Sequence, residues 1–238
     1  MSRSLGVTNA LREVVPEWSL ELFVALSMLG DLVVIVPALA VLYLTDVGQS
    51  LVRDDRSEPL CSTRTAFLVA VVFGGCALVV LLKGLFALPR TSLELQVAEA
   101  SVYGFPSGHT MGATIFFGSL AAWFSVGQLW SRFAGAGLVI SLVGFSRLVL
   151  GVHYLVDVLA AVLFGTGYLV AIAWLAKGRP ERAFAVAIGI AVLATVVTGG
   201  SARALLALAG TVGAGVGWQV IELPSVRGRM VALVGQTE

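Results

Sequence analysis

Charged residues are scarce in this 238-residue chain, and their scarcity excludes an ordinary soluble domain. Only 12% of the residues are Asp, Glu, Lys or Arg, whereas soluble domains carry about 25%. The formal net charge is +1 and no basic patch stands out, which argues against nucleic-acid binding. The two cysteines, Cys61 in a polar loop and Cys76 in an apolar run, predict neither a disulfide nor a thiolate metal site.

Long apolar runs take the place of charge. Hydrophobic residues make up 58% of the chain, and the mean hydropathy is +0.96. Runs of about 20 residues match the length needed to cross a hydrocarbon core roughly 30 Å thick. The sequence therefore predicts an all-α, polytopic membrane helical bundle of about six or seven membrane segments. The segments are expected at 19–44, 66–88, 109–126, 133–150, 154–176, 183–198 and 204–222.

The first of these segments is interrupted by Gly30-Asp31 and by Pro37. It is either one tilted crossing, or a half-inserted helix followed by a short one. An acid at mid-membrane depth is costly, so Asp31 is expected to face the bundle or to lie near the interface. An N-cap role after a break at Gly30 is an equally good interpretation of Asp31.

The basic residues of the loops predict the orientation of the bundle. If the segments cross alternately, nine loop cations lie on one side, which the positive-inside rule makes cytoplasmic. The polar motifs described below then fall on the opposite, extracytoplasmic face, where Arg3, Arg12 and Arg203 are the remaining cations. The nine loop cations are Arg53, Arg56, Arg64, Arg132, Lys177, Arg179, Arg182, Arg227 and Arg229.

His153 and Asp157 are the first candidates for chemistry. They stand four residues apart at the start of an apolar run, so they project from the same face of a helix. The aspartate can accept a hydrogen bond from one imidazole nitrogen and leave the other nitrogen free to attack, as in a catalytic triad. The alternative is a helix-end pair in which Asp157 serves only the N–H groups of the first turn.

The second histidine follows a turn, Pro106-Ser107-Gly108-His109, directly before another apolar run. Ser107 suits a helix N-cap, and Gly108 allows close approach of an anion to the backbone. The N–H groups and positive dipole end of such a helix form a phosphate site. His109 stands where it can protonate a leaving alkoxide, although a capped helix with an incidental histidine is the alternative.

Three cations complete the set. Arg147, six residues before His153, offers planar bidentate donors suited to phosphate oxygens, or else snorkels to the interface. Lys83 and Arg90 are seven residues apart, about two helical turns, and would face one pocket if the helix continued past Pro89. Snorkelling is the better interpretation of this pair alone, but unpartnered cations should avoid the outer face.

Together these segments resemble the type 2 phosphatidic acid phosphatase superfamily, which includes lipid phosphate phosphatases and vanadium haloperoxidases. The family pattern is Lys-x6-Arg-Pro, Pro-Ser-Gly-His and Ser-Arg-x5-His-x3-Asp. The second and third motifs are complete here, the third starting at Ser146-Arg147. The first departs from the pattern, because Thr91 stands in place of the usual proline and Pro89 precedes the arginine.

The resemblance implies a fold, an activity and a role for each motif residue. It implies one integral membrane phosphatase domain over residues 1–238, with its motif core at 83–157 and a core four-helix phosphatase/haloperoxidase-like bundle. Such an enzyme would hydrolyse a lipid phosphate or polyprenyl diphosphate at the extracytoplasmic face of the cell membrane. His153 would be the nucleophile that forms a phosphohistidine, Asp157 its orienter and His109 the general acid. The residues that bind the phosphate would be Lys83, Arg90, Ser107, Gly108 and Arg147.

Partners and competing functions follow from the same pattern. The expected partners are the lipid substrate and the bilayer, with no nucleic acid. Phosphatases of the family need no metal, and the sequence has no acidic cluster or His-x-x-x-His pattern, so no cofactor is expected. A phosphotransferase and an anion transporter are the alternatives, although charges at helix ends on one face favour an enzyme. Residues 92–100 are expected to form a lid or rim, in which Glu94 and Glu99 either tune head-group preference or are simply solvated.

Overall fold

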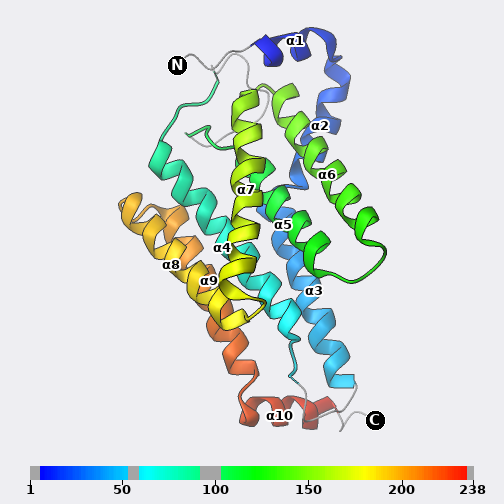
Figure 1. Ribbon diagram of the computed structural model, residues 1–238, viewed down its shortest axis with the longest axis vertical. Coiled ribbons are helices and arrows are strands. Elements are labelled where there is room, and N and C mark those ends of the chain that lie inside the picture. Colours follow the sequence, from blue (N-terminus) through cyan, green and yellow to red (C-terminus); the bar gives the residue numbers. More distant parts are fainter. Residues whose placement is uncertain (1–5, 53–58, 92–102, 235–238) are drawn as a thin grey trace.

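The computed structural model of the chain describes residues 6–52, 59–91 and 103–234. Within these residues the regular elements are helical, and the single strand-like pairing is an isolated bridge between Pro89 and Tyr103. The helices run mostly along the long axis of the molecule (Figure 1). In chain order they are α1 (Gly6–Val14), η1 (Glu17–Ser19), α2 (Leu20–Met28), α3 (Leu32–Val52), α4 (Thr63–Phe86), α5 (Gly108–Trp123), α6 (Leu129–Val149), α7 (Leu155–Ala176), α8 (Pro180–Val197), α9 (Ala202–Ile221) and α10 (Pro224–Val234).

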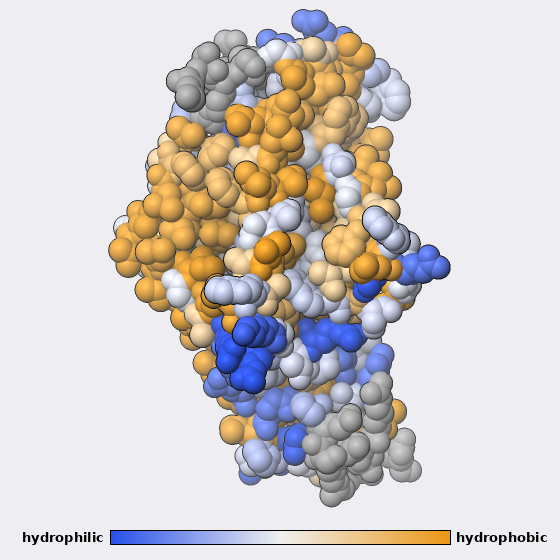
Figure 2. Space-filling model, in the orientation of Figure 1, coloured by the Kyte–Doolittle hydropathy of each residue, from blue (hydrophilic) through white to orange (hydrophobic). Residues whose placement is uncertain are grey.

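The prediction of an all-α, polytopic membrane protein is confirmed. In the described part of the chain, six helices are long and apolar enough to cross a membrane: α3, α4, α6, α7, α8 and α9. Helix α5 has 16 residues, about 24 Å at 1.5 Å per residue, and so is shorter than a full hydrocarbon core. Figure 2 shows apolar surface over most of the upper part of the bundle, with hydrophilic residues gathered toward its lower end.

The helix boundaries agree with the apolar runs to within four residues, except at the first run. There the chain breaks at Gly30-Asp31, so that the short α2 precedes the 21-residue α3, which contains Pro37. Both sequence-based arrangements of this run are therefore wrong in detail. Asp31 starts α3 as an N-cap residue: its Oδ1 accepts a hydrogen bond from the Val33 N–H at 3.0 Å, as the N-cap interpretation predicted.

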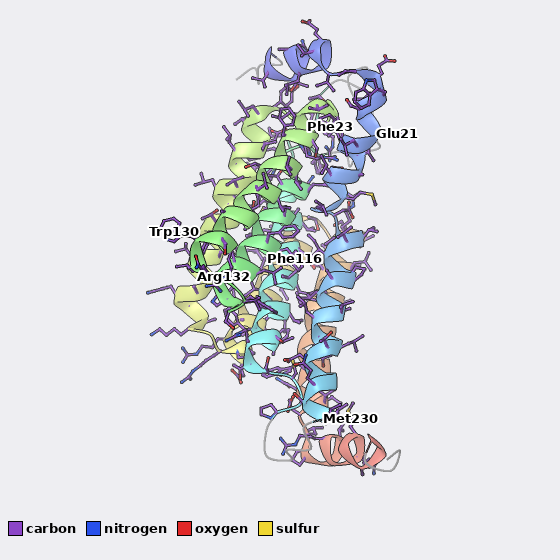
Figure 3. All side chains as sticks on the ribbon, turned by 90° about the vertical axis from the view of Figure 1, so that its right-hand side faces the viewer. Glu21, Phe23, Phe116, Trp130, Arg132 and Met230 are labelled. Carbon is purple, nitrogen blue, oxygen red and sulfur yellow. The ribbon has the colours of Figure 1, made fainter. Side chains whose placement is uncertain are left out.

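Helix α4 lies at the centre of the packing. It contacts α5, α8 and α9, while α5 also packs against α6 and α7. Two glycines of α4 allow close approach: a Cβ at Gly74 would lie 2.5 Å from the Tyr168 hydroxyl, and one at Gly75 would lie 2.7 Å from Ile115. That hydroxyl donates to the Val71 carbonyl at 2.8 Å and joins α7 to α4. Figure 3 shows Phe116 inside this bundle, whereas Trp130 projects away from it.

Two acids tie the lower end of the bundle together. Asp46 accepts a hydrogen bond from the Ser62 N–H at 2.7 Å, and Glu222 accepts from the Cys61 N–H at 2.8 Å. Both cysteines are free, as the sequence predicted. The N-terminal α1 lies at the opposite, upper end of the molecule (Figure 1). Because the helices alternate in direction, the end of α4, the start of α5, the end of α6 and the starts of α7 and α9 all meet toward that upper end.

Candidate active site

The buried centre of the site is the connection between α6 and α7, which carries His153. This connection turns at Gly151, whose φ of +70° is a conformation that glycine adopts without steric cost. Asp157 follows in the first turn of α7, and both side chains are fully buried, at 0% exposure. The Ser107 N–H donates to the Asp157 carbonyl at 3.1 Å, so the start of α5 is joined directly to the start of α7.

Asp157 both orients the histidine and caps the helix. Its Oδ2 lies 3.3 Å from His153 Nδ1 and also accepts the Tyr154 N–H at 3.0 Å. The same carboxylate oxygen therefore contacts the imidazole and caps the helix, so both sequence-based interpretations of this pair apply. A carboxylate acceptor at Nδ1 favours the tautomer that carries its proton on that nitrogen, and it leaves a lone pair on Nε2.

Arg90 covers that lone pair. Its Nη1 lies 3.0 Å from His153 Nε2 and donates to the Val152 carbonyl at 3.0 Å. Because a guanidinium only donates hydrogen bonds, Nε2 must be the acceptor. Burial lowers the pKa of His153 well below its ordinary value, and the positive charges of Arg90 and Arg147 act in the same direction. His153 is thus a neutral imidazole whose unprotonated Nε2 points at a cation.

The path of the first motif differs from the helical arrangement that its spacing suggested. Helix α4 ends at Phe86 and Ala87 adopts a left-handed conformation with φ 45°, so Arg90 lies in a loop. The helix does not continue past Pro89, yet Lys83 and Arg90 still line the same cavity. Thr91, the departure from the family pattern, donates from its hydroxyl to the Gly151 carbonyl and so fastens this loop beside the turn that carries His153.

Arg147 is the most deeply buried cation of the site, at 3% exposure. Its Nη1 donates to the Ser27 hydroxyl on α2 at 3.1 Å, while its buried Nε has no hydrogen-bond partner among the described residues. An unsatisfied buried donor costs about 1–3 kcal/mol. This buried N–H is therefore available to an acceptor that enters the site.

The second motif begins α5, as its sequence predicted, but not through the expected cap. Ser107 occupies the N-cap position without a side-chain cap bond, and its hydroxyl lies 2.9 Å from that of Thr110. Gly108 faces Lys83: a Cβ here would lie 3.4 Å from Lys83 Cε. The Lys83 ammonium itself donates to the Tyr103 carbonyl at 3.0 Å.

His109 pairs with an acid from a different part of the chain. Its Nε2 lies 2.9 Å from Asp31 Oδ2, and the two side chains are 27% and 34% exposed. The hydrogen bond from His109 lowers the pKa of Asp31 to about 2, so this carboxylate is ionised at neutral pH. Asp31 thus faces the bundle, one of the two positions that its cost in the membrane suggested.

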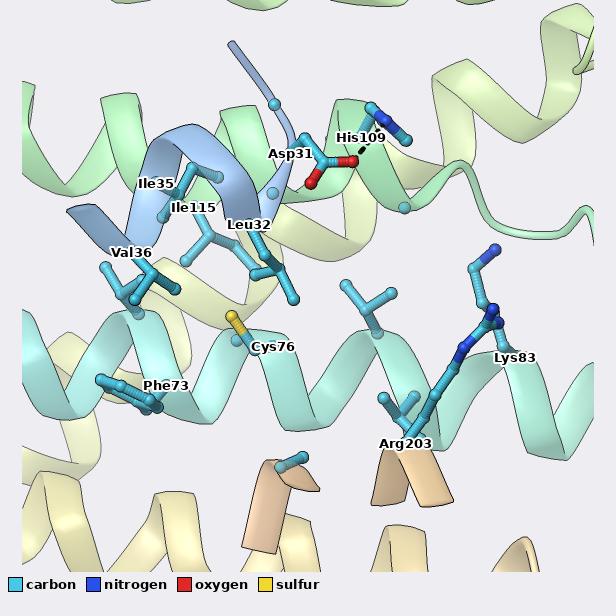
Figure 4. Close-up of a pocket in the computed structure, with 18 of the residues that line it drawn as sticks. Asp31, Leu32, Ile35, Val36, Phe73, Cys76, Lys83, His109, Ile115 and Arg203 are labelled. Atoms are coloured by element: carbon cyan, nitrogen blue, oxygen red, sulfur yellow. Dashed lines mark ion pairs between the residues drawn. The ribbon is translucent and has the colours of Figure 1, made fainter. Parts of the chain in front are cut away.

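A cavity of about 420 Å³ opens beside these groups. One end is polar and the other is lined by apolar side chains of α3, α4 and α9 (Figure 4). His153 is not among the lining residues, but Arg90, which touches its Nε2, is. The charged or titratable residues of the lining are Asp31, Lys83, Arg90, His109, Arg147 and Arg203.

The sequence did not predict the places of three residues in the site. Arg203, at the start of α9, had been noted only as a cation of the outer face, yet it lines the cavity near Lys83 (Figure 4). Asp31 was singled out by the break in the first apolar run, but without its partner. Ser27, the partner of Arg147, carries no recognisable signal in an apolar helix.

Among the described residues, no three His, Cys, Asp or Glu side chains gather closely enough to share a metal ion. The proposed lid or rim at 92–100, with Glu94 and Glu99, lies outside the described residues.

Comparison with known proteins identifies the family to which this chain belongs. The family model described as the PAP2 superfamily matches residues 64–181, about half of the chain. No curated protein sequence is significantly similar. The fold is similar to a crystal structure described as the first transmembrane PAP2 type phosphatidylglycerolphosphate phosphatase, from Bacillus subtilis. The TM-score is 0.59 and the identity 22%, and the match covers 73% of this chain and 84% of that one. The motifs, the family match and the shared fold agree: the chain is a multi-pass membrane protein that belongs to the PAP2 superfamily.

Proposed function

We propose that this protein is a membrane-embedded phosphatase that hydrolyses a lipid phosphate or polyprenyl diphosphate through a phosphohistidine on His153. The observation that carries this proposal is the buried, neutral His153, held by Asp157 at Nδ1 and covered by Arg90 at Nε2, beside a cation-lined cavity. The family and the fold of the Bacillus subtilis phosphatidylglycerolphosphate phosphatase support a phosphatase.

The reaction proceeds in two displacements at phosphorus. In the first, the Nε2 lone pair of His153 forms an N–P bond while the bond from phosphorus to the leaving oxygen breaks, and His109 gives that oxygen a proton. In the second, water attacks phosphorus, His109 takes its proton, and the N–P bond breaks to release inorganic phosphate. Charge spreads over the phosphoryl oxygens in both transition states, which is where the donors of Lys83, Arg90 and Arg147 stabilise most.

Arg90 must move for the first step to occur. Its guanidinium occupies the direction from which Nε2 would attack phosphorus. A phosphate in the cavity offers charged oxygens, which a guanidinium can bind through two parallel hydrogen bonds in place of the single bond to the neutral imidazole. The substrate therefore draws Arg90 onto its own oxygens and uncovers the nucleophile. The unpartnered Nε of Arg147 gives the same oxygens a second donor.

The apolar end of the cavity suits the tail of the lipid. Phe73, Cys76 and Val80 line it on α4 and lead to Lys83 on the same helical face. From Phe73 to Lys83 is ten residues, about 15 Å along the helix axis. Figure 4 shows Phe73, Cys76 and Lys83 along α4, which runs between α3 and α9. A lipid lying along α4 would place its head group among the cations.

A bulky residue in the middle of this row tests the tail route. Cys76→Trp is expected to lower kcat/KM for a long-chain lipid phosphate by about tenfold or more, because the indole fills the path of the tail and overpacks it. Hydrolysis of a small soluble phosphate ester should change little. Leu163→Trp on α7, a position 70% exposed on the outside of the bundle, is the matched control. Equal losses with both substrates would refute the tail route.

The orientation of the site follows from the charges at the other ends of the helices. Seven of the nine loop cations lie in described residues, away from the upper end: in the first turns of α4, α6 and α8, in the connection before α8, and in α10. Arg53 and Arg56 lie outside the described residues. The positive-inside rule makes that side cytoplasmic, so the site would open to the extracytoplasmic face of the cell membrane.

Phosphate release by the purified protein is the direct test of the function. In detergent, a panel of lipid phosphates and polyprenyl diphosphates should yield inorganic phosphate, and vanadate should inhibit because it mimics five-coordinate phosphorus. EDTA should leave the rate unchanged. Intact cells should hydrolyse a membrane-impermeant phosphate ester if the site faces outward. No release from any member of the panel would refute the function, and loss of activity with EDTA would refute a metal-free mechanism.

A further inference from the structure

The second histidine of the site has an acid partner that lies outside the family match. Asp31 belongs to the break between α2 and α3, far upstream of the matched residues 64–181. Its Oδ2 lies 2.9 Å from His109 Nε2, and its Oδ1 accepts the Val33 N–H at 3.0 Å. Both carboxylate oxygens are therefore engaged, and the carboxylate has a fixed direction.

Close backbone packing between the α2–α3 break and α5 holds Asp31 next to His109. A Cβ at Gly30 would collide with the carbonyl oxygen of His109, and one at Gly112 would lie 2.7 Å from the carbonyl oxygen of Gly30. Any side chain larger than hydrogen at either glycine would force the break away from α5. The break therefore fits tightly against the first turn of α5, and Asp31 reaches His109 from a position set by the backbone.

Asp31 is also the single carboxylate among the described residues that line the cavity. A histidine that donates a proton must first hold one, and neighbouring positive charges oppose that state whereas a carboxylate at hydrogen-bond distance favours it. The charged side chains that share the cavity with His109 come from α4, from the loop after it, from α6, from α9 and from the α2–α3 break: Lys83, Arg90, Arg147, Arg203 and Asp31.

We infer that Asp31 is a positioning residue that binds His109 through Nε2, favours the protonated form of its ring against burial and the neighbouring cations, and leaves the Nδ1–H to protonate the leaving oxygen. The site then holds two histidine–aspartate pairs, in which the carboxylates bind different ring nitrogens. Asp157 binds Nδ1 of His153 and leaves Nε2 to attack, whereas Asp31 binds Nε2 of His109 and leaves Nδ1 to donate. This inference rests on the proposed phosphatase function.

Asp31→Asn tests the inference with little change in shape, because asparagine is as good an N-cap as aspartate. The amide cannot offset the cations, so His109 should lose its proton at lower pH. The alkaline limb of the kcat/KM profile should move down by about one pH unit or more. At neutral pH, hydrolysis of an alkyl phosphate should fall by about 10–100-fold. Hydrolysis of 4-nitrophenyl phosphate, whose leaving group departs without a proton, should fall much less in its first step, measured as the burst of nitrophenolate.

Two further variants make the outcome decisive. Asp31→Glu retains the charge and should restore part of the alkyl phosphate activity, whereas Glu21→Gln removes an exposed acid of α2 and should change neither substrate. Equal losses with both leaving groups and an unmoved alkaline limb would show a merely structural Asp31 and overturn the inference. So would full activity of Asp31→Asn. If the wild-type protein releases no phosphate at all, the proposed function fails first, and the two failures are distinguishable.

Discussion

His153→Ala is expected to abolish turnover, with a loss of roughly 10⁵-fold or more, because it removes the only protein atom that forms a bond to phosphorus. The other donors of the site still bind the phosphate, so substrate affinity should change far less than kcat. Lipid phosphate hydrolysis in detergent, followed as inorganic phosphate, measures the effect. Turnover within about a hundredfold of wild type would mean that His153 is not the nucleophile.

Because His153 is fully buried, its replacement needs a folding control. His153→Gln retains a polar side chain for Asp157 and should also be inactive. Both variants should elute from size exclusion as the wild type does and retain its helical circular dichroism. A variant that folds and binds inorganic phosphate but does not turn over isolates the loss to the chemical step.

Asp157→Asn is expected to lower turnover by around 10⁴-fold, as the corresponding change does in the serine triad. When phosphorus bonds to Nε2, the ring of His153 becomes positively charged, and the carboxylate at Nδ1 stabilises that charge. An amide has no charge to offer and can also hold the ring in the wrong tautomer. Its oxygen can still accept the Tyr154 N–H, so the start of α7 should persist.

The decisive comparison is between activity and stability in this variant. A large loss of kcat with little change in thermal unfolding would assign Asp157 to orientation of the nucleophile. An Asn variant with wild-type turnover would show that Asp157 only caps α7. Asp46→Asn, which changes an acid that binds the Ser62 N–H at the lower end of the bundle, serves as the matched control and should leave kcat unchanged.

The features that depend only on residues close together in the sequence could be predicted from the sequence pattern alone. Apolar runs predicted the helices, since a span must be both long and apolar to cross a membrane. The i, i+4 spacing predicted the contact between His153 and Asp157, because such residues share a helix face. Asp31 as an N-cap was likewise readable from the break at Gly30.

The contacts that complete the site could not be predicted in this way. Arg90 reaches His153 because α4 ends before it and Thr91 fastens the loop to Gly151, which spacing along a helix cannot show. The pair of Asp31 and His109 joins residues 78 positions apart and depends on how the α2–α3 break packs against α5. Arg203 enters the cavity because α9 packs beside α4. Each of these contacts is a property of tertiary packing.

The phosphohistidine itself is the most direct test of the account. In His109→Ala, 4-nitrophenyl phosphate should still phosphorylate the enzyme, because nitrophenolate leaves without a proton, whereas water loses its general base and hydrolysis slows. The phosphoenzyme should then accumulate, survive quenching in alkali, and be located by tandem mass spectrometry. The account predicts one phosphate on His153, in an amount that matches the burst of nitrophenolate. Phosphate on another residue, or turnover by the wild type with no phosphoenzyme in either protein, would contradict it.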